Sequence, residues 1–213
     1  MTLFCGHYGS GKTNIAVNFA LHLRAQGHSV AIADIDVVNP YFRTKDSLAE
    51  LEAAGVDVVA LPFANTSVDL PALPQEVYGL VQRRDCRVVM DIGGDDRGAY
   101  ALGRYRPYIL EENDFDNLFV VNFFRPLTRD AKSALEVFRE IEAAGGIPFT
   151  GIVNNSNIGP ETSLETLEKT DALARELASL AGVPLVMTTA MEEVCEKDKN
   201  RRFFPLRLQK KLF

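Results

Sequence analysis

The stretch that decides the fold stands near the start of the chain, where residues 2–13 read TLFCGHYGSGKT. A short apolar run is followed by a loop with glycines at positions 6, 9 and 11, and then by Lys12 and Thr13. Residues 6–13 match the pattern G-x-x-x-x-G-K-[S/T], in which glycines let backbone N–H groups face phosphate oxygens. A helix that begins directly after such a loop adds the partial positive charge of its first turn. The stretch therefore predicts a strand, a phosphate-binding loop and a helix in succession.

Within this loop, two side chains have tasks that the pattern specifies. Lys12 is expected to reach the β- and γ-phosphates of a nucleoside triphosphate, and Thr13 to place its hydroxyl on Mg²⁺. The residues expected to contact the nucleotide form one run, namely Gly9, Ser10, Gly11, Lys12, Thr13 and Asn14.

Two further motifs place carboxylates at the ends of apolar runs. Residues 88–94 read VVMDIGG, so we expect Asp91 to hold Mg²⁺ through a water and the N–H of Gly94 to meet the γ-phosphate. Asp34 and Asp36 follow an earlier run and point the same way if the chain stays extended. One of them can support Mg²⁺ and its waters, and the other can orient an attacking water. Capping of a helix or solvation of a loop is the alternative for this pair.

Short apolar runs alternate with segments of helical spacing along the whole chain. The predicted strands are 2–5, 29–33, 56–60, 87–90, 118–121, 149–153 and 185–187. The predicted helices are 12–25, 129–143 with Thr128 as its cap, and 162–180. Such alternation indicates a mostly parallel sheet with helices on both faces. With 213 residues and no linker, we expect a single α/β domain over 1–213, a three-layer P-loop NTPase fold.

The composition narrows the class of protein. The formal net charge of −6 argues against a nucleic-acid-binding surface, and 46% hydrophobic residues supply a full core. The three cysteines are far apart without a C-x-x-C pair, which excludes the usual spacing of zinc or iron–sulfur ligands. No apolar run is long enough to span a bilayer and no signal segment is recognised, so we expect a cytoplasmic protein.

The order of the motifs resembles that of the MinD/ParA group of P-loop ATPases. That order is a phosphate loop, a D-x-D pair, an apolar strand ending in D-x-x-G, and a later apolar strand ending in Asn154. The nitrogenase iron protein belongs to the same CobQ/CobB/MinD/ParA group. The resemblance implies that Asp36 orients the attacking water, that Asp34 belongs to the outer shell of Mg²⁺, and that Asn154 contacts adenine.

One position departs from the pattern of the group. The group carries a second lysine near the start of the loop, which reaches the nucleotide of a partner subunit, and His7 stands there in this chain. An imidazole is a poor substitute for a permanent ammonium. The basic residues that could substitute are Arg43, Arg97 and Arg125.

The stretch 154–157, NNSN, bears on which base is bound. GTPases carry N-K-x-D here, and its Asp accepts hydrogen bonds from guanine. Asn157 stands in place of that Asp and lacks the charge that makes guanine binding strong. We therefore expect ATP rather than GTP. Turn formation is the alternative role for such an Asn-rich stretch.

Three functions remain at this point. The leading hypothesis is an ATP-dependent switch or ATPase that uses Mg²⁺, with Lys12 and Asp36 as catalytic residues. Its partner would be a second copy of the chain, a metalloenzyme or a membrane. The alternative is an ATP-dependent ligase resembling dethiobiotin synthetase, in which loop 39–45 binds the substrate. A nucleotide or metabolite kinase fits less well, because no arginine-rich lid segment stands out.

The tail after Pro205 has an amphipathic pattern. Leu206, Leu208, Leu212 and Phe213 fall on one side of a helical projection, opposite three cationic residues. We expect it to pack as a last helix against the domain, with membrane contact as the alternative.

Overall fold

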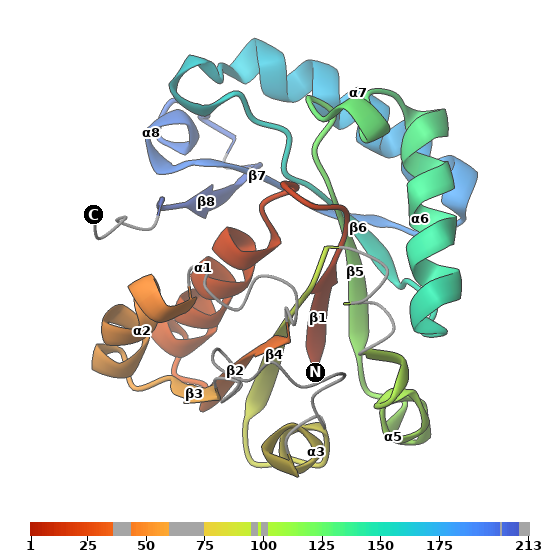
Figure 1. The fold of residues 1–213 in the computed structure, drawn as a ribbon. Helices are drawn as coiled ribbons and strands as arrows, with labels where there is room; N and C mark the ends of the chain where they lie inside the picture. Colours follow the sequence, from red (N-terminus) through yellow and green to blue (C-terminus); the bar gives the residue numbers. More distant parts are fainter. Residues whose placement is uncertain (36–43, 60–74, 95–97, 99–101, 201, 209–213) are drawn as a thin grey trace, which may run out of the picture.

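In the part of the chain that the structure describes, one eight-stranded parallel sheet carries helices on both faces, as the sequence predicts (Figure 1). The computed structural model describes residues 1–35, 44–59, 75–94, 98, 102–200 and 202–208. The strands follow the order β3-β2-β4-β1-β5-β6-β7-β8 across the sheet. The phosphate-loop strand β1 is therefore central, with β4 on one side and β5 on the other.

The bounds of the elements are as follows. The strands are β1 Thr2–Cys5, β2 Val30–Ile35, β3 Asp57–Val59, β4 Arg87–Ile92, β5 Asp116–Val121, β6 Gly151–Asn154, β7 Leu185–Met191 and β8 Phe204–Leu206. The α-helices are α1 Lys12–Ala25, α2 Thr44–Ala53, α3 Gln75–Val81, α5 Arg106–Glu112, α6 Ala131–Gly145, α7 Leu164–Ala181 and α8 Glu192–Cys195. Two 3₁₀ turns cover Pro126–Thr128 and Gly159–Glu161.

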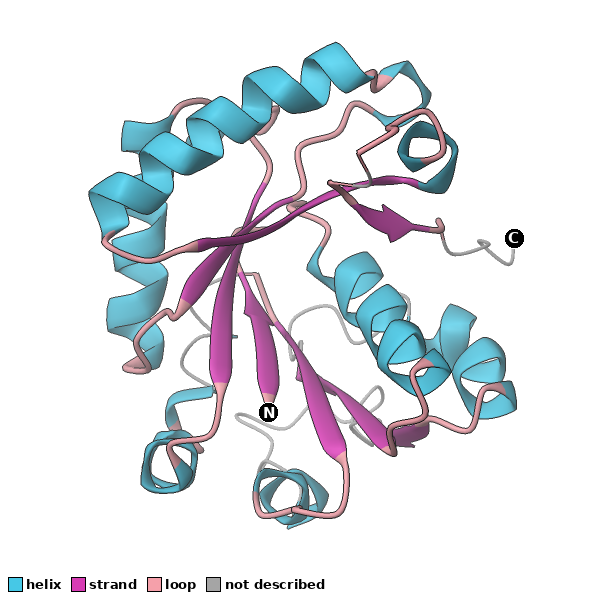
Figure 2. Ribbon diagram, turned by 180° about the vertical axis from the view of Figure 1, so that it is seen from behind, coloured by secondary structure: helices cyan, strands magenta, loops and turns pink. Residues whose placement is uncertain are grey.

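Two apolar layers hold the helices on the sheet, and alternate residues of each strand serve opposite layers. Leu3 of β1 packs with α5, α6 and α7, whereas the next residue, Phe4, packs with α1 and α2. Figure 2, which shows the molecule from behind, displays the same two helical layers with the sheet between them. Since every central strand is buried on both faces, its polar residues are confined to its ends, where loops leave the sheet.

The predicted starts of two helices were wrong. Helix α6 begins after Asp130, whose carboxylate accepts the N–H of Ser133 at 2.8 Å. The predicted cap Thr128 instead donates its hydroxyl to the backbone carbonyl of Asn122 at 2.7 Å. Helix α7 begins two residues later than predicted, because Ser163 caps it. In both helices the residue directly before the first turn is the N-cap, because only its side chain reaches the free N–H groups of that turn.

The tail also departs from the prediction. Residues Phe204–Leu206 form β8, which pairs in parallel with β7, so Leu206 belongs to a strand rather than to a last helix. Leu206 is buried in the layer of α1. Residues 209–213 lie outside the described residues. In the described part of the chain, no helix has both the length and the apolar character needed to cross a membrane.

Candidate nucleotide-binding site

The phosphate loop lies between β1 and α1, at the carboxyl edge of the sheet. Gly11 occupies the N-cap of α1 in the left-handed region, at φ 91°, and no side chain caps that helix. Among the described residues, no side chain accepts the first N–H groups of α1, which is the arrangement that binds an anion. In Figure 1 the loop is the red segment between the end of β1 and the start of α1.

Lys12 and Gly94 lie close together at this loop, although they are 82 positions apart in the sequence. Lys12 is buried, and its Nζ donates to the carbonyl of His7 at 3.4 Å. A Cβ placed on Gly94 would lie 2.7 Å from that Nζ and 2.8 Å from the backbone N of Tyr8. Only glycine leaves room at position 94 for this close approach. The predicted γ-phosphate contacts of Lys12 and Gly94 are thus placed side by side.

The side of the loop that faces β4 is acidic. The hydroxyl of Thr13 donates to Oδ2 of Asp91 at 2.5 Å. Asp34 of β2 is the direct register partner of Asp91 in β4, so the two carboxylates stand on the same face of neighbouring strands. We call Thr13, Asp34 and Asp91 the acidic flank.

The donor set of the acidic flank fits Mg²⁺. A hydroxyl and carboxylates are hard oxygen ligands, and Mg²⁺ is commonly held by one or two carboxylates together with phosphate oxygens and water. The described residues contain no group of three or more His, Cys, Asp or Glu side chains that could hold a metal by themselves. With a nucleotide bound, its phosphate oxygens would add to the ligands of the acidic flank. Asp36, predicted to orient water, lies outside the described residues.

The other side of the loop is held by an amide that the sequence analysis did not assign. Asn155 is buried, and its Nδ2 donates to the carbonyl of Ser10 at 2.6 Å. Its Oδ1 accepts the hydroxyl of Thr189, on β7, at 2.7 Å. A Cβ on Gly11 would lie 2.2 Å from Nδ2 of Asn155. The amide of Asn155 therefore fixes the loop backbone to the sheet. The one feature of the sequence that could have pointed to Asn155 is its position directly after the strand that ends in Asn154.

The predicted adenine contact, Asn154, is turned into the protein. Its side chain is fully buried, its Oδ1 accepts the N–H and hydroxyl of Ser156, and its Nδ2 donates to Thr170 at 3.3 Å. Contact with a base would require some of these bonds to be exchanged. The adenine contact of Asn154 therefore stays a prediction.

The remaining predicted contacts lie in or beside the loop. Ser10 is buried, and its hydroxyl has no hydrogen-bond partner among the described residues. Asn14 accepts the Nδ2 of Asn18 through its backbone carbonyl at 2.7 Å, along helix α1. Among the three arginines considered, Arg43 and Arg97 lie outside the described residues, as does the greater part of loop 39–45. Arg125 donates from Nε to the carbonyl of Gly9 at 2.9 Å.

Beneath the loop, Cys5 is not a nucleophile. Its thiol donates to Oδ1 of Asn117 at 3.3 Å, and burial raises the pKa of Cys5 to about 12. The thiolate is the reactive form of cysteine, so this residue serves as core.

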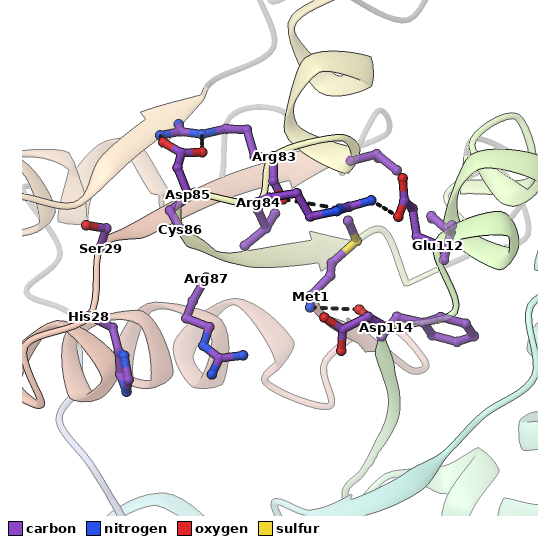
Figure 3. Close-up of a pocket in the computed structure, with 14 residues that line it drawn as sticks. Met1, His28, Ser29, Arg83, Arg84, Asp85, Cys86, Arg87, Glu112 and Asp114 are labelled. Carbon is purple, nitrogen blue, oxygen red and sulfur yellow. Dashed lines mark hydrogen bonds and ion pairs between the residues drawn. The ribbon is translucent and has the colours of Figure 1, made fainter.

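A cavity of about 380 Å³ lies at the opposite end of the sheet (Figure 3). Two of the three arginines that line it are paired with carboxylates: Arg83 pairs with Asp85 and Asp57, and Arg84 pairs with Glu112. The paired Arg83 guanidinium lowers the pKa of Asp85. Because the cavity lies at the end of the sheet opposite the phosphate loop, it has no part in the nucleotide site.

Comparison with known proteins agrees with this geometry. Residues 5–198 match the family model described as the CobQ/CobB/MinD/ParA nucleotide binding domain. A signal recognition particle protein from Mycobacterium leprae is 30% identical, over an alignment that covers 93% of this chain and 36% of the relative. This chain thus spans about a third of the length of that relative.

Solved structures with the same fold include two FtsY proteins. The cell division protein FtsY of Thermotoga maritima gives a TM-score of 0.58 at 17% identity, covering 97% of this chain and 65% of that one. Chloroplast FtsY of Physcomitrella patens gives a TM-score of 0.60 at 18% identity, covering 90% of this chain and 58% of that one. The signal recognition particle 54 kDa protein of Aeropyrum pernix, solved in complex with GDP, gives a TM-score of 0.57 at 16% identity, covering 88% of this chain and 40% of that one. At these identities the likeness establishes the fold. The glycine loop and the juxtaposed Lys12 and Gly94 agree with the family model that matches residues 5–198. Because that match covers most of its length, this chain belongs to the CobQ/CobB/MinD/ParA family of P-loop nucleotide-binding domains.

Proposed function

We propose that this protein is a Mg²⁺-dependent ATP-binding switch that hydrolyses ATP and passes its nucleotide state to a protein partner. One observation carries the proposal: Lys12, Gly94 and the acidic flank converge on one phosphate loop from three separate strand ends. A convergence of this kind provides a cradle for a triphosphate, a lysine for its terminal phosphates and oxygen ligands for its metal.

Each residue has a task in this proposal. The N–H groups of the loop and of α1 bind the phosphates, and Lys12 neutralises charge on the β- and γ-phosphates. Mg²⁺, when bound, supplies Lewis-acid stabilisation of phosphate charge. Thr13 and Asp91 hold it, Asp34 orients its waters, and Asp36 orients the water that attacks the γ-phosphate.

ATP is the proposed nucleotide because of the residues after β6. Asn157 stands where a guanine-binding Asp would be needed, and its Nδ2 donates to the backbone carbonyl of Asn155 at 3.1 Å. A neutral amide offers guanine a weaker acceptor than a carboxylate does. GTP is the competing nucleotide, since the Aeropyrum relative was solved with GDP.

A switch is proposed because nucleotide state can be read at Gly94. This glycine lies at the end of the D-x-x-G motif, and a Cβ added to it would clash with both Lys12 and the backbone N of Tyr8. A γ-phosphate placed there would contact the start of the segment after β4, which could then present a different surface to a partner. A second copy of the chain is the first partner to test.

The experiment is calorimetric titration of the protein with ATP, GTP and ADP, with and without Mg²⁺, paired with light scattering in each nucleotide state. We expect ATP to bind most tightly with Mg²⁺, and Lys12→Ala to abolish the binding. A change in mass with ATP would support the switch and identify a self-partner. Preference for GTP would overturn the base assignment, and an absence of triphosphate binding would overturn the proposal as a whole.

A further inference from the structure

The loop after β5 brings a cation to the phosphate loop. Residues 122–128 are held rigidly: Asn122 accepts the N–H of Arg125 at 3.1 Å and the hydroxyl of Thr128 at 2.7 Å through its backbone carbonyl. The N–H of Phe123 donates to the hydroxyl of Ser156 at 3.0 Å. Because Asn122, Phe123 and Thr128 are buried, the backbone of this loop presents Arg125 from a fixed position.

The guanidinium of Arg125 lies against the bare Cα of Gly9. Its Nε donates to the carbonyl of Gly9 at 2.9 Å. A Cβ on Gly9 would lie 3.4 Å from Nε, 3.6 Å from Cζ and 3.8 Å from Nη2. The absence of a side chain at Gly9 therefore leaves room for the guanidinium of Arg125. The Nε of Arg125 is already used in the hydrogen bond that holds the guanidinium at this position.

The rest of the guanidinium is available to a ligand. Within the part of the chain that the structure describes, neither terminal nitrogen of Arg125 has a hydrogen bond, and no carboxylate forms an ion pair with it. Nearby Arg129, in contrast, pairs with Asp130 at 3.7 Å. Arg125 is thus an exposed, permanently charged fork placed beside the loop that binds phosphate.

We propose that Arg125 is a phosphate-binding residue of the nucleotide site, and that its two terminal nitrogens donate to phosphate oxygens of the bound nucleotide. This inference rests on the proposed function, because it requires a nucleotide on the loop. The acidic flank lies on the β4 side of β1, whereas Arg125 comes from the β5 side. A triphosphate on the loop would consequently lie between a metal on one side and a guanidinium on the other.

The negative charge of a bound nucleotide explains why a second cationic residue would be needed at the loop. A nucleoside triphosphate with one Mg²⁺ still carries a net negative charge, which the single charge of Lys12 does not neutralise. A preorganised guanidinium binds phosphate with charge-assisted hydrogen bonds, which are stronger than neutral ones. It also costs little ordering on binding, because Gly9 already holds it.

The test compares four variants for binding of whichever triphosphate the wild type prefers, of the matching diphosphate, and of the nucleoside. Arg125→Ala should weaken triphosphate binding by about ten- to 100-fold and leave nucleoside binding unchanged. Arg125→Lys keeps the charge and should retain part of the affinity. Arg125→Gln keeps a donor for the Gly9 carbonyl but loses the charge, and should resemble Arg125→Ala. Arg129→Ala, four positions away in the same region, is the matched control and should bind like the wild type.

Salt dependence separates a phosphate contact from a purely structural role. Removal of a phosphate-binding cation should reduce the slope of log Kd against log salt concentration, whereas loss of a backbone anchor should not. Wild-type affinity in Arg125→Ala, or full affinity in Arg125→Gln, would overturn the inference while leaving the proposed function intact. Absence of binding in the wild type itself would count against the proposed function, so the two failures are distinguishable.

Discussion

The two sides of the phosphate loop differ in chemistry, although both are built from the ends of parallel strands. On the β4 side, Asp91 and Asp34 stand as register partners, and Thr13 reaches the first of them. On the β5 and β6 side, Asn155 and Arg125 donate to the carbonyls of the loop, and no carboxylate among the described residues of that side forms a hydrogen bond or ion pair with it.

This difference teaches how the loop can bind a polyanion and a metal together. Acceptor oxygens collected on one side attract a cation, while N–H donors on the other side hold the loop backbone through its carbonyls. Within the loop, the N–H of Ser10 donates to the carbonyl of His7 at 3.1 Å, and we expect the remaining N–H groups of the loop to bind the phosphates. The sides can be separated experimentally, because a change on the acidic side should act through Mg²⁺ and a change on the donor side should not.

The largest effect is expected where the loop meets its donor side. Gly11→Ala would push a methyl group to within 2.2 Å of Nδ2 of Asn155, in a left-handed conformation at φ 91°. We expect ATP affinity to fall by about 100-fold, or about 2.7 kcal/mol, as measured by calorimetry. Gly27 is a matched control, since it has φ 90° and no atom within 4 Å of its Cβ position. Gly27→Ala should lower stability by about 1–2 kcal/mol through backbone strain alone and leave ATP affinity unchanged. Equal losses of affinity in the two variants would show that strain, rather than contact with Asn155, is responsible.

The next effect concerns the acidic side. Asp91→Asn should remove most of the gain in ATP affinity that Mg²⁺ provides, by about tenfold, because a carboxylate is replaced by a neutral amide. Titration with Mg²⁺ and again with EDTA measures this gain directly. Asp116→Asn serves as the control, since Asp116 is exposed at the opposite end of β5. An Asp91→Asn protein with the full Mg²⁺ effect would remove Asp91 from the metal site.

A smaller effect is expected from the hydroxyl that holds Asn155. Thr189→Val removes the donor to Oδ1 of Asn155 and leaves a buried acceptor without it, at a cost of about 1–3 kcal/mol in stability. ATP affinity should fall equally with and without Mg²⁺. The neighbouring Thr188→Val is the control, because the hydroxyl of Thr188 faces away from the loop and donates to Asp171 at 2.6 Å. If the loss of ATP affinity in Thr189→Val depends on Mg²⁺, the two sides of the loop do not act separately.

The smallest effect lies outside the loop, at the cap of α6. The N–H of Ser133 holds the pKa of Asp130 below its usual range. A carboxyl with a lowered pKa in the folded state stabilises the fold above its unfolded pKa, and this contribution disappears as the pH falls through the folded pKa. Asp130→Asn should therefore lower Tm slightly at pH 7, and the difference from wild type should shrink as the pH falls through the folded pKa of Asp130. A difference in Tm that stays constant as the pH is lowered would rule out the charge of Asp130 as its source. ATP affinity at pH 7 should not change.

Much of the local structure could be predicted because its signals lie close together in sequence. Helix α1 has the predicted bounds of 12–25, since a glycine precedes it and another follows it within two residues of its end. The cap of α6 could not be chosen by composition, because Thr128 and Asp130 are both good caps. Strand β8 was missed because it is three residues long, contains Pro205 and is recognisable only by its pairing with β7.

The sequence by itself determined the phosphate loop, the parallel α/β sheet and the order of the motifs, because glycine spacing and apolar periodicity act over a few residues. Only the tertiary structure decided which side chains meet at the loop. The contact of Asn155 with Ser10 joins residues 145 positions apart, and that of Arg125 with Gly9 joins residues 116 apart. Such contacts depend on strand order and register, which place β4 on one side of β1 and β5 on the other. Local sequence cannot specify that arrangement, because it arises from the packing of the whole sheet.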